Sequence, residues 1–378
     1  MAKLRMGMIG GGPGSFIGRI HRMAAELDGE IQLVCGAFSS DAEKSRTAGA
    51  AMHLDPARVY GSYAEMIESE QRLPADRRMD FVAIVTPNHV HYEPAMLALQ
   101  SGFDVVVDKP LCFSLEEART LEKEVERTGR LLAVTYTYSG YPMVKEMRAL
   151  IADGRIGKVR KVYVEYPQGW LATDLERSGN KQADWRTDPQ RSGAGGAIGD
   201  IGTHAAHLAE YATGLRISAV NAMLNTIVPG RRLDDDASML LRFNNDATGV
   251  LMATQVAVGE ENNLNIRIYG EKGGVEWHQA EPNSLILRWP DRPREILRAG
   301  WGYLGSAAQS NTRTPPGHPE GYLEAFANIY AAFARALRNR AGDHDFPTVV
   351  DGVRGMEFID CVIRSARSSQ KWTEMAAQ

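Results

Sequence analysis

The sequence predicts a two-domain α/β protein, in which a parallel sheet near the N-terminus is followed by an α+β domain with a large, open, mostly antiparallel sheet. Three observations predict this fold. The chain has 378 residues, more than one compact core usually serves. Strand-like apolar runs alternate with helical patterns up to about residue 134, and later runs follow one another without helices between them. We expect one domain over residues 1–140 and the other over residues 141–378.

Five short apolar runs rich in β-branched residues mark the strands of the first domain. Between the last two runs, Ser114 and Glu117 have the spacing of a capping box, which predicts a helix that begins there and ends at Gly129. Strands that alternate with helices indicate βαβ units and a parallel sheet. The runs are Met6–Ile9, Ile31–Phe38, Phe81–Val85, Asp104–Val107 and Leu131–Val134.

The pattern changes after Tyr141-Pro142. A helix is expected to about Ala152, and Val162, Val164 and Tyr166 then alternate with polar-facing positions as in a half-buried strand. Later strands are separated by turn signals, and the Asp234–Asp236 run predicts an exposed turn. The expected strands are Ser238–Phe243, Gly249–Val256, Leu264–Tyr269, Gly274–Trp277 and Ser284–Trp289, and the expected last helices are Tyr322–Asn339 and Val350–Ser368.

Composition narrows the possible partners. The formal net charge is −4, and no block of Lys and Arg marks a nucleic-acid-binding face. No run of about 18 apolar residues and no signal-peptide pattern is present, so we expect a soluble cytoplasmic protein without a membrane partner. Cys35, Cys112 and Cys361 lack metal-ligand spacing, which predicts buried free thiols and no metal site.

Residues 10–18 form a glycine cluster between the first predicted strand and the first predicted helix. Glycine lets the backbone approach a pyrophosphate, whose charge is attracted by the amides and dipole of the helix N-terminus. An ordinary tight turn would also use glycines, but the position after the first strand favours a Rossmann dinucleotide site. Pro13 and Gly14 resemble an insertion, and Gly18 fits the close-packing position. We assign to this site Gly10, Gly12, Pro13, Gly14, Ser15 and Phe16.

The end of the second strand bears on the choice between NAD and NADP. A carboxylate is expected there if NAD is bound, but the sequence has Ser39 and Ser40. These hydroxyls, with Lys44 one turn further on, are suited to a 2′-phosphate and favour NADP. Alternatively, Asp41 reaches the ribose, or the serines cap a helix.

Two polar segments follow neighbouring strands, where open α/β sheets bind ligands. Asp108-Lys109-Pro110 follows the Asp104–Val107 run, and Lys109 is suited to stabilise a developing alkoxide, although a lone lysine is more often a surface residue. The other segment, Thr86-Pro87-Asn88-His89-Val90-His91, follows the Phe81–Val85 run. From the two segments we expect Thr86, Pro87, Asn88, His91, Asp108 and Lys109 to contact the cofactor.

A glycine-rich run, residues 193–202, contains Asp200 and precedes His204. The two side chains are four residues apart, so on a helix they share one face. The ordinary pKa of an imidazole suits proton transfer near neutrality. A capping or metal-binding histidine is the alternative, but no ligand spacing completes a metal site.

These motifs, in this order, resemble the Gfo/Idh/MocA oxidoreductase family, which includes glucose-fructose oxidoreductase and inositol dehydrogenases. The resemblance covers nearly the whole chain. It implies that Lys109 is the catalytic lysine and that Asp200 and His204 orient the substrate and transfer its proton. Trp185-Arg186 resembles the family's Trp-Arg signature. Asp108 replaces the usual Glu of the Glu-Lys-Pro motif, and the glycine loop is elongated.

The resemblance implies an NAD(P)-dependent dehydrogenase or reductase that acts on a secondary alcohol of a sugar, cyclitol or sugar derivative. Two alternatives stay open: a glycosidase that retains its cofactor and works by transient oxidation, and a non-catalytic NAD(P) sensor. The family also implies a homodimer or homotetramer, in which an open sheet face is covered by another subunit. We expect the substrate to contact Tyr138, Tyr166, Trp170, Trp185, Arg186 and His318, although the aromatic residues would also suit a core.

Overall fold

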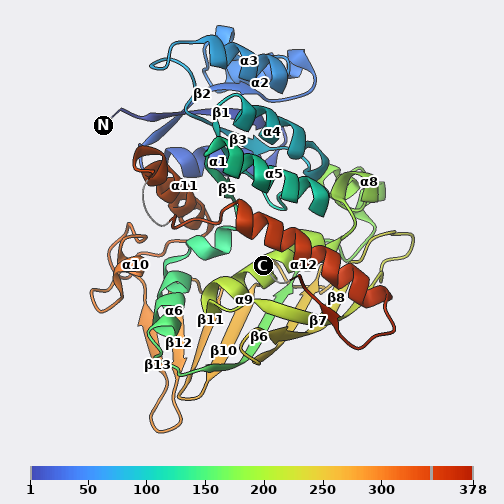
Figure 1. Cartoon of the computed structure of the whole chain (residues 1–378), viewed down its shortest axis with the longest axis vertical. Helices are drawn as coiled ribbons and strands as arrows, with labels where there is room; N and C mark the ends of the chain where they lie inside the picture. The colour runs from blue at the N-terminus through green and yellow to red at the C-terminus, as the bar shows by residue number, and fades with distance from the viewer. Residues whose placement is uncertain (1, 341–343, 377–378) are drawn as a thin grey trace. The chain divides into compact units, whose positions relative to one another are not determined.

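The computed structural model describes residues 2–340 and 344–376. The chain divides into two compact units (Figure 1). Unit 1 comprises residues 1–137 and 322–353, and unit 2 comprises residues 138–321 and 354–378. The first boundary lies close to the expected one at residue 140. Residues 322–353, which we placed in the second domain, belong instead to unit 1.

Unit 1 is built on a five-stranded sheet in which every pair of neighbours is parallel, in the order β2-β1-β3-β4-β5. Each of the five predicted runs forms a strand, so the predicted Rossmann sheet is confirmed. The parallel register brings the carboxyl ends of β1, β3 and β4 to one edge of the sheet. The strands are β1 (Leu4–Gly10), β2 (Ile31–Ala37), β3 (Phe81–Val85), β4 (Asp104–Val107) and β5 (Leu132–Val134).

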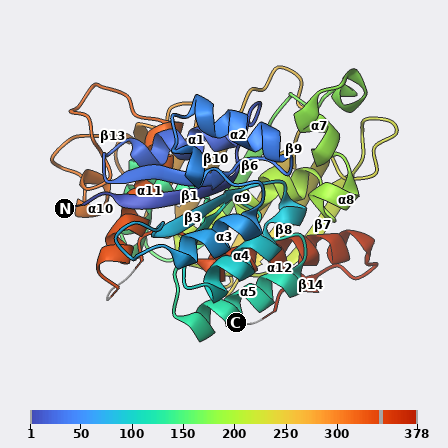
Figure 2. The ribbon, with the colours of Figure 1, turned by 90° about the horizontal axis from the view of Figure 1, so that it is seen from above.

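Helices flank this sheet, with α3 beside α4, α4 beside α5, and α1 beside α11 (Figure 2). The predicted capping box of α5 is present, because Ser114 accepts from the backbone amide of Glu117 and the Glu117 carboxylate accepts from that of Ser114. Gly129 ends α5 with a φ of 63°. The helices are α1 (Phe16–Glu26), α2 (Ala42–Ala51), α3 (Tyr63–Arg72), α4 (Tyr92–Gln100), α5 (Leu115–Thr128) and α11 (Tyr322–Arg338).

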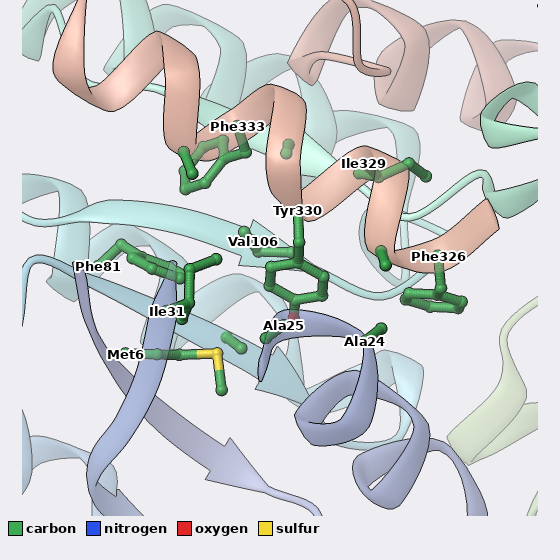
Figure 3. Close-up of a cluster of buried hydrophobic side chains, with 14 of the residues drawn as sticks. Met6, Ala24, Ala25, Ile31, Phe81, Val106, Phe326, Ile329, Tyr330 and Phe333 are labelled. Carbon is green, nitrogen blue, oxygen red and sulfur yellow. The ribbon is translucent and has the colours of Figure 1, made fainter. Parts of the chain in front are cut away.

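Packing explains why α11 belongs to unit 1. Its Phe326, Tyr330 and Phe333 are almost fully buried in one core cluster with Met6 and Phe81 (Figure 3). The Phe81 and Phe333 rings meet edge to face, with centroids 5.3 Å apart. Burying three aromatic side chains stabilises unit 1 by several kcal/mol at about 2 kcal/mol each. The sequence showed a helix here but not which core its apolar face would join.

Unit 2 contains a nine-stranded sheet in the order β13-β12-β11-β10-β6-β9-β8-β7-β14. Only β6 and β9 pair in parallel, so the predicted mostly antiparallel sheet is confirmed. Strands β7, β13 and β14 were not predicted. The strands are β6 (Val159–Pro167), β7 (Ile217–Asn225), β8 (Asp236–Phe243), β9 (Thr248–Thr254), β10 (Asn265–Gly270), β11 (Gly274–His278), β12 (Ser284–Arg288), β13 (Glu295–Arg298) and β14 (Thr373–Glu374).

Helices α6 (Pro142–Ala152) and α9 (Thr203–Thr213) lie across one face of this sheet (Figure 1). Helix α12 (Val349–Arg367) is tied to α9 by a buried ion pair, in which Arg354 Nη2 lies 2.9 Å from Glu210 Oε1. The three cysteines are free and buried, as predicted. Of the helices in the described part of the chain, none combines the length and apolar character needed to cross a membrane. The short helices are α7 (Lys181–Arg186), α8 (Pro189–Ser192) and α10 (Ser306–Gln309).

Candidate functional site

The glycine loop of unit 1 lies between β1 and α1, where it was predicted. Gly10, Gly11 and Gly14 have φ values of 82°, 73° and 80°, which side chains rarely adopt. A Cβ at Gly12 would lie 2.5 Å from the carbonyl oxygen of Phe38, and one at Gly18 would lie 2.3 Å from the Cα of Gly11. The backbone therefore forms a cradle that only glycine allows, and it suits a pyrophosphate at the N-terminus of α1.

Ser15 caps α1, because its hydroxyl accepts from the backbone amide of Gly18 at 3.2 Å. Pro13 and Gly14 form a turn that lengthens the loop before this cap. Phe16 begins the helix with 65% of its side chain exposed. The exposed Phe16 ring and the Pro13–Gly14 turn thus lie next to the glycine cradle, where the sequence predicts the cofactor.

At the end of β2, Asp41 rather than the serines caps a helix. Its Oδ1 accepts from the backbone amides of Glu43 and Lys44 at 3.0 and 3.1 Å, which helps to lower its pKa, and its Oδ2 lies 3.6 Å from Lys44 Nζ. The Ser39 hydroxyl accepts from the amide of Asp41 at 3.2 Å. Ser40 and Lys44 are exposed. Asp41 is thus engaged with α2, and Lys44 pairs with it at the surface.

Two polar turns follow β3 and β4, and the parallel pairing of these strands brings the turns to the same sheet edge. His91 links them, because its Nδ1 lies 2.9 Å from the Pro110 carbonyl oxygen and its Nε2 lies 2.8 Å from that of Thr86. The His91 side chain is fully buried. Lys109 is partly exposed on the second turn. Thr86, Pro87, Asn88, His91, Asp108 and Lys109 therefore lie on or next to two turns at one edge of the sheet, and their contact with a cofactor stays a prediction.

Asp108 is held by neighbours on three elements of unit 1. Its Oδ1 accepts from Thr135 Oγ1 at 2.8 Å and from the Lys109 amide at 2.9 Å, and it lies 4.0 Å from Nε2 of the buried His21. Burial by itself would raise the pKa of Asp108, but His21, the Lys109 charge and the Thr135 hydroxyl outweigh it, so the pKa is lowered. Asp108 is therefore an anion beside Lys109.

In unit 2, Asp200 lies in a π-helical turn, η5 (Ile198–Gly202), that leads directly into α9, where His204 is the second residue. Isolated π-turns occur frequently at functional sites. Gln255 Nε2 donates to Asp200 Oδ2 at 2.9 Å, and Arg186 Nε lies 3.3 Å from the same oxygen. The Asp200 carboxylate is thus oriented by two side chains distant in the sequence.

The preceding glycine run is fixed by Asp234. A Cβ at Gly196 would lie 2.0 Å from the Asp234 carbonyl oxygen, and the Asp234 carboxylate accepts from the amides of Gly196 and Ile198 at 2.7 and 2.8 Å. Asp235 is 2% exposed and pairs with Arg231. The expectation of an exposed turn at Asp234–Asp236 is therefore wrong, because these first two carboxylates bind backbone amides and a buried guanidinium.

A hydrogen-bonded aromatic and amide cluster lies near His204. The Tyr138 and Tyr166 hydroxyls hydrogen-bond to each other, and Asn262 binds both, with 2.7 Å from Tyr166 Oη to Asn262 Oδ1. The Tyr138 ring meets the His204 ring edge to face at 5.0 Å between centroids. Burial raises the pKa of Tyr138 to about 12, so its hydroxyl keeps its proton. Two predicted substrate residues thus lie beside the predicted base.

Gln168 extends this cluster, since its amide donates to Asn262 Oδ1 and its carbonyl accepts from Trp170 Nε1 at 3.0 Å. Arg186 lies 4.2 Å from the Trp185 ring centroid and 5.9 Å from that of Trp170. Sequence analysis missed Gln168, Gln255 and Asn262. Isolated amides outside any motif give no signal in one sequence, because only the strand pairing brings them together.

His318 lies apart from these contacts in an exposed loop of unit 2. Its Nδ1 is 3.3 Å from the Pro315 carbonyl oxygen. The buried Glu320 organises the loop by accepting from the amides of Arg313 and Thr314. Across the described ranges 2–340 and 344–376, no group of three or more His, Cys, Asp or Glu side chains could hold a metal ion.

Comparison of the chain with known protein families identifies the family to which it belongs. Residues 4–136 match the oxidoreductase family with an NAD-binding Rossmann fold, and residues 144–276 match the GFO/IDH/MocA C-terminal domain. The chain belongs to the Gfo/Idh/MocA family of NAD-binding oxidoreductases. The family suggested by the motifs is therefore confirmed.

Several relatives match over nearly their whole length. The chain is 34% identical to an inositol dehydrogenase homologue from Azotobacter vinelandii, whose structure in complex with NAD+ has a TM-score of 0.94 and covers 99% of this chain and 97% of that one. The same homologue is known with NADH and myo-inositol, at a TM-score of 0.91. An uncharacterized oxidoreductase, YfiI, of Bacillus subtilis is 33% identical over 98% of this chain and 96% of its own. Levoglucosan dehydrogenase of Pseudarthrobacter phenanthrenivorans is 28% identical over 99% of each chain.

Proposed function

We propose that this Gfo/Idh/MocA oxidoreductase is an NAD(P)-dependent dehydrogenase that reversibly oxidises a secondary alcohol of a sugar, cyclitol or related polyol. The observation that carries the proposal is that Lys109 and His204, the two groups needed for the chemistry, are each held in an ordered local structure. Lys109 lies on the turn that follows β4, at the same edge of the unit 1 sheet as the glycine loop that follows β1, and His204 follows the π-turn that holds Asp200 in unit 2. The Azotobacter vinelandii homologue with NADH and myo-inositol supports a polyol substrate.

Each residue has a proposed chemical role. The dinucleotide, when bound, supplies the hydride acceptor. His204 takes the proton of the hydroxyl group, because an imidazole accepts protons near neutral pH. Lys109 stabilises the oxygen as negative charge develops on it. Asp200, fixed by Arg186 and Gln255, orients His204 or a neighbouring substrate hydroxyl.

The substrate would be held by the cluster around Tyr138, Tyr166 and Trp170. This cluster offers hydroxyl and amide groups together with aromatic faces, which is the combination that binds a polyol ring. The nearby guanidinium of Arg186 is paired with Asp200 and is therefore not a free anion site. We propose an uncharged polyol in preference to a phosphorylated one.

Reduction of the cofactor, followed at 340 nm, tests the activity. Purified protein is mixed with NAD+ or NADP+ and a panel of inositols, aldoses and glycosides, including myo-inositol and levoglucosan. Turnover with a polyol is expected in wild type and in K123A, and K109A should abolish it. Lys123 is a suitable control because it is exposed on α5. If no compound in the panel gives net cofactor reduction, but a glycoside is cleaved and the cofactor stays bound, the protein is a retained-cofactor glycosidase instead. Cofactor binding without either reaction would identify a sensor.

We also propose that NADP is preferred over NAD. The Asp41 carboxylate accepts from the first amides of α2, whereas the hydroxyls of Ser39 and Ser40 and the exposed Lys44, which would exchange its pairing with Asp41 for the phosphate, suit a 2′-phosphate. Relatives are known in complex with NAD+ or NADH, so the preference for NADP needs a direct measurement. Dissociation constants for NADPH and NADH, obtained by fluorescence, should favour NADPH in wild type and NADH in S39D. Tighter NADH binding by wild type would refute the preference.

A homodimer or homotetramer is proposed from the sheet face opposite α6 and α9. The row of residues that crosses this face runs through Ile296, Ile286, Glu276, Arg267, Tyr163, Val250 and Leu240. Leu240 is 45% exposed and Ile296 is 52% exposed, and such apolar surface favours burial against a second copy. Light scattering should give an oligomer that L240K weakens. A wild-type monomer would exclude this proposal.

A further inference from the structure

The imidazole of His91 has an unusual set of neighbours. Both ring nitrogens face carbonyl oxygens, 2.9 Å away at Pro110 and 2.8 Å away at Thr86. A neutral imidazole carries one N–H donor and one lone pair, so it can donate to only one of these oxygens. The other oxygen then faces a lone pair inside a fully buried site. Only the imidazolium form donates to both carbonyls.

The two carbonyls belong to turns that the proposed function uses. Thr86 begins the turn after β3, and its hydroxyl also donates to the Val90 carbonyl at 3.1 Å. Pro110 directly follows Lys109 on the turn after β4. A ring that bonds both carbonyls therefore fixes the spacing between the cofactor-edge turn and the Lys109 turn. The two ring nitrogens are already engaged, so a direct contact of His91 with the cofactor is not needed to explain its place.

The charges around His91 set two opposing effects. Burial lowers the pKa of His91 below the ordinary imidazole value, and the anionic Asp108 and the backbone carbonyls of Thr86, Pro110 and Leu111 offset this only in part. Asp108 is the charged side chain that acts on the ring, and His21 and Lys109 act in turn on Asp108. A ligand that holds the Thr86 and Pro110 carbonyl oxygens at hydrogen-bonding distance from the ring should therefore favour the protonated form of His91.

We propose that His91 is a positioning residue whose doubly protonated ring clamps the Thr86 turn to the Lys109–Pro110 turn, so that proton uptake at His91 is coupled to cofactor binding. The proposal rests on the proposed cofactor site and on the proposed role of Lys109. By linkage, a ligand that prefers the clamped form must raise the affinity of His91 for its proton, and acid must tighten the binding of that ligand.

Protein labelled with 15N-histidine tests the clamp in wild type, and a variant is needed only to assign the signals. The ring signals of His91, assigned by their loss in H91Q, are followed from pH 5 to pH 8 with and without saturating NADH. As the pH falls, we expect the ring nitrogen that carries the lone pair to take up a proton, with a midpoint below the ordinary imidazole value when NADH is absent. NADH should move the midpoint upward. A single neutral tautomer throughout, or a midpoint that NADH leaves unchanged, would overturn the proposal.

Fluorescence titration of NADH at pH 6 and pH 8 gives an independent readout. Wild type and H89Q should bind NADH more tightly at pH 6, by up to about tenfold for each pH unit by which NADH displaces the His91 midpoint. H91Q should lose this difference, because an amide cannot take up the proton. His89 is a matched control because it is an exposed histidine on the same turn. Equal pH dependence in H91Q and H89Q would contradict the coupling.

These measurements separate the two proposals. Absence of NADH binding at every pH would remove the proposed cofactor site and the coupling together. NADH binding that tightens with acid, in a protein without dehydrogenase activity, would support the clamp and refute the proposed reaction. A normal dehydrogenase in which H91Q keeps the wild-type pH profile and the wild-type kcat and KM would refute only the clamp.

Discussion

Arg186 and Asp200 form a salt bridge in which Nε of the arginine lies 3.3 Å from Oδ2 of the carboxylate. The side chains are 24% and 16% exposed, so solvent screens the pair only in part. Asp200 also accepts from Gln255 at 2.9 Å. Its carboxylate is therefore a fixed anion that orients neighbouring groups.

R186Q should reduce kcat/KM by about tenfold, because it removes the positive charge that lies beside the partly buried Asp200 carboxylate, and a loss of tenfold corresponds to about 1.4 kcal/mol. Steady-state kinetics with the substrate identified at 340 nm measures the loss. R177Q is the control, since the Arg177–Asp174 pair has an arginine side chain that is 75% exposed. An exposed pair of this kind contributes about 0–1 kcal/mol. Equal effects of the two substitutions would show that Arg186 has no special role.

D108N should make the protein less stable at neutral pH. The pKa of Asp108 is lowered in the folded state, so its contribution to stability is fully present above the unfolded value of about 3.9. That contribution is lost as the pH falls further. Urea unfolding should give a free energy of unfolding lower by about 1–3 kcal/mol in D108N at pH 7, and a smaller difference at pH 3. A difference that grows toward acid pH would contradict the lowered pKa.

D108E tests the reach of this carboxylate. His21 Nε2 lies 4.0 Å from Asp108 Oδ1, beyond hydrogen-bonding distance, and it has no hydrogen-bond partner among the described residues. One more methylene should bring the carboxylate within reach of His21. Stability in urea should be kept or raised, by about 1 kcal/mol. A loss as large as that of D108N would show that the turn cannot accommodate the longer side chain.

G18A should impair both folding and cofactor binding. A Cβ at residue 18 would lie 2.3 Å from the Gly11 Cα, so α1 and the glycine loop would have to separate. Such overpacking costs about 1–3 kcal/mol. Urea unfolding and NADH titration measure the two effects. G302A is the control, because a Cβ there meets no atom within 4 Å. NADH affinity equal in G18A and wild type would show that this close approach does not shape the cradle.

N262A should weaken substrate binding through the tyrosine cluster. Asn262 bonds Tyr138, Tyr166, Gln168 and Gln279, so its loss leaves several buried polar groups without one of their partners. We expect kcat/KM to fall by about tenfold, with most of the change in KM. N263A is a matched control, because the Asn263 side chain donates to Glu260 at an exposed position. Unchanged KM in N262A would place the substrate elsewhere.

The sequence could predict much of the fold because its signals are local. The capping box at Ser114 and the glycine at residue 129 bound a helix through contacts within a few residues. The five apolar runs and the glycine cluster likewise fix strands and a turn by their own composition. The strand-end positions of Lys109 and Thr86 then follow from parallel pairing.

The rest depended on contacts between distant parts of the chain. The sequence by itself determined the family, the Rossmann sheet and the motifs around Lys109, Asp200 and His204. Only the tertiary structure decided that α11 joins the core of unit 1, that Asp234 caps a glycine run, and that Asn262 binds Tyr138 and Tyr166. It also decided that His91 faces two carbonyls. The physical reason is that packing and hydrogen bonding depend on which side chains meet in space, whereas periodicity and caps depend only on neighbours in the chain.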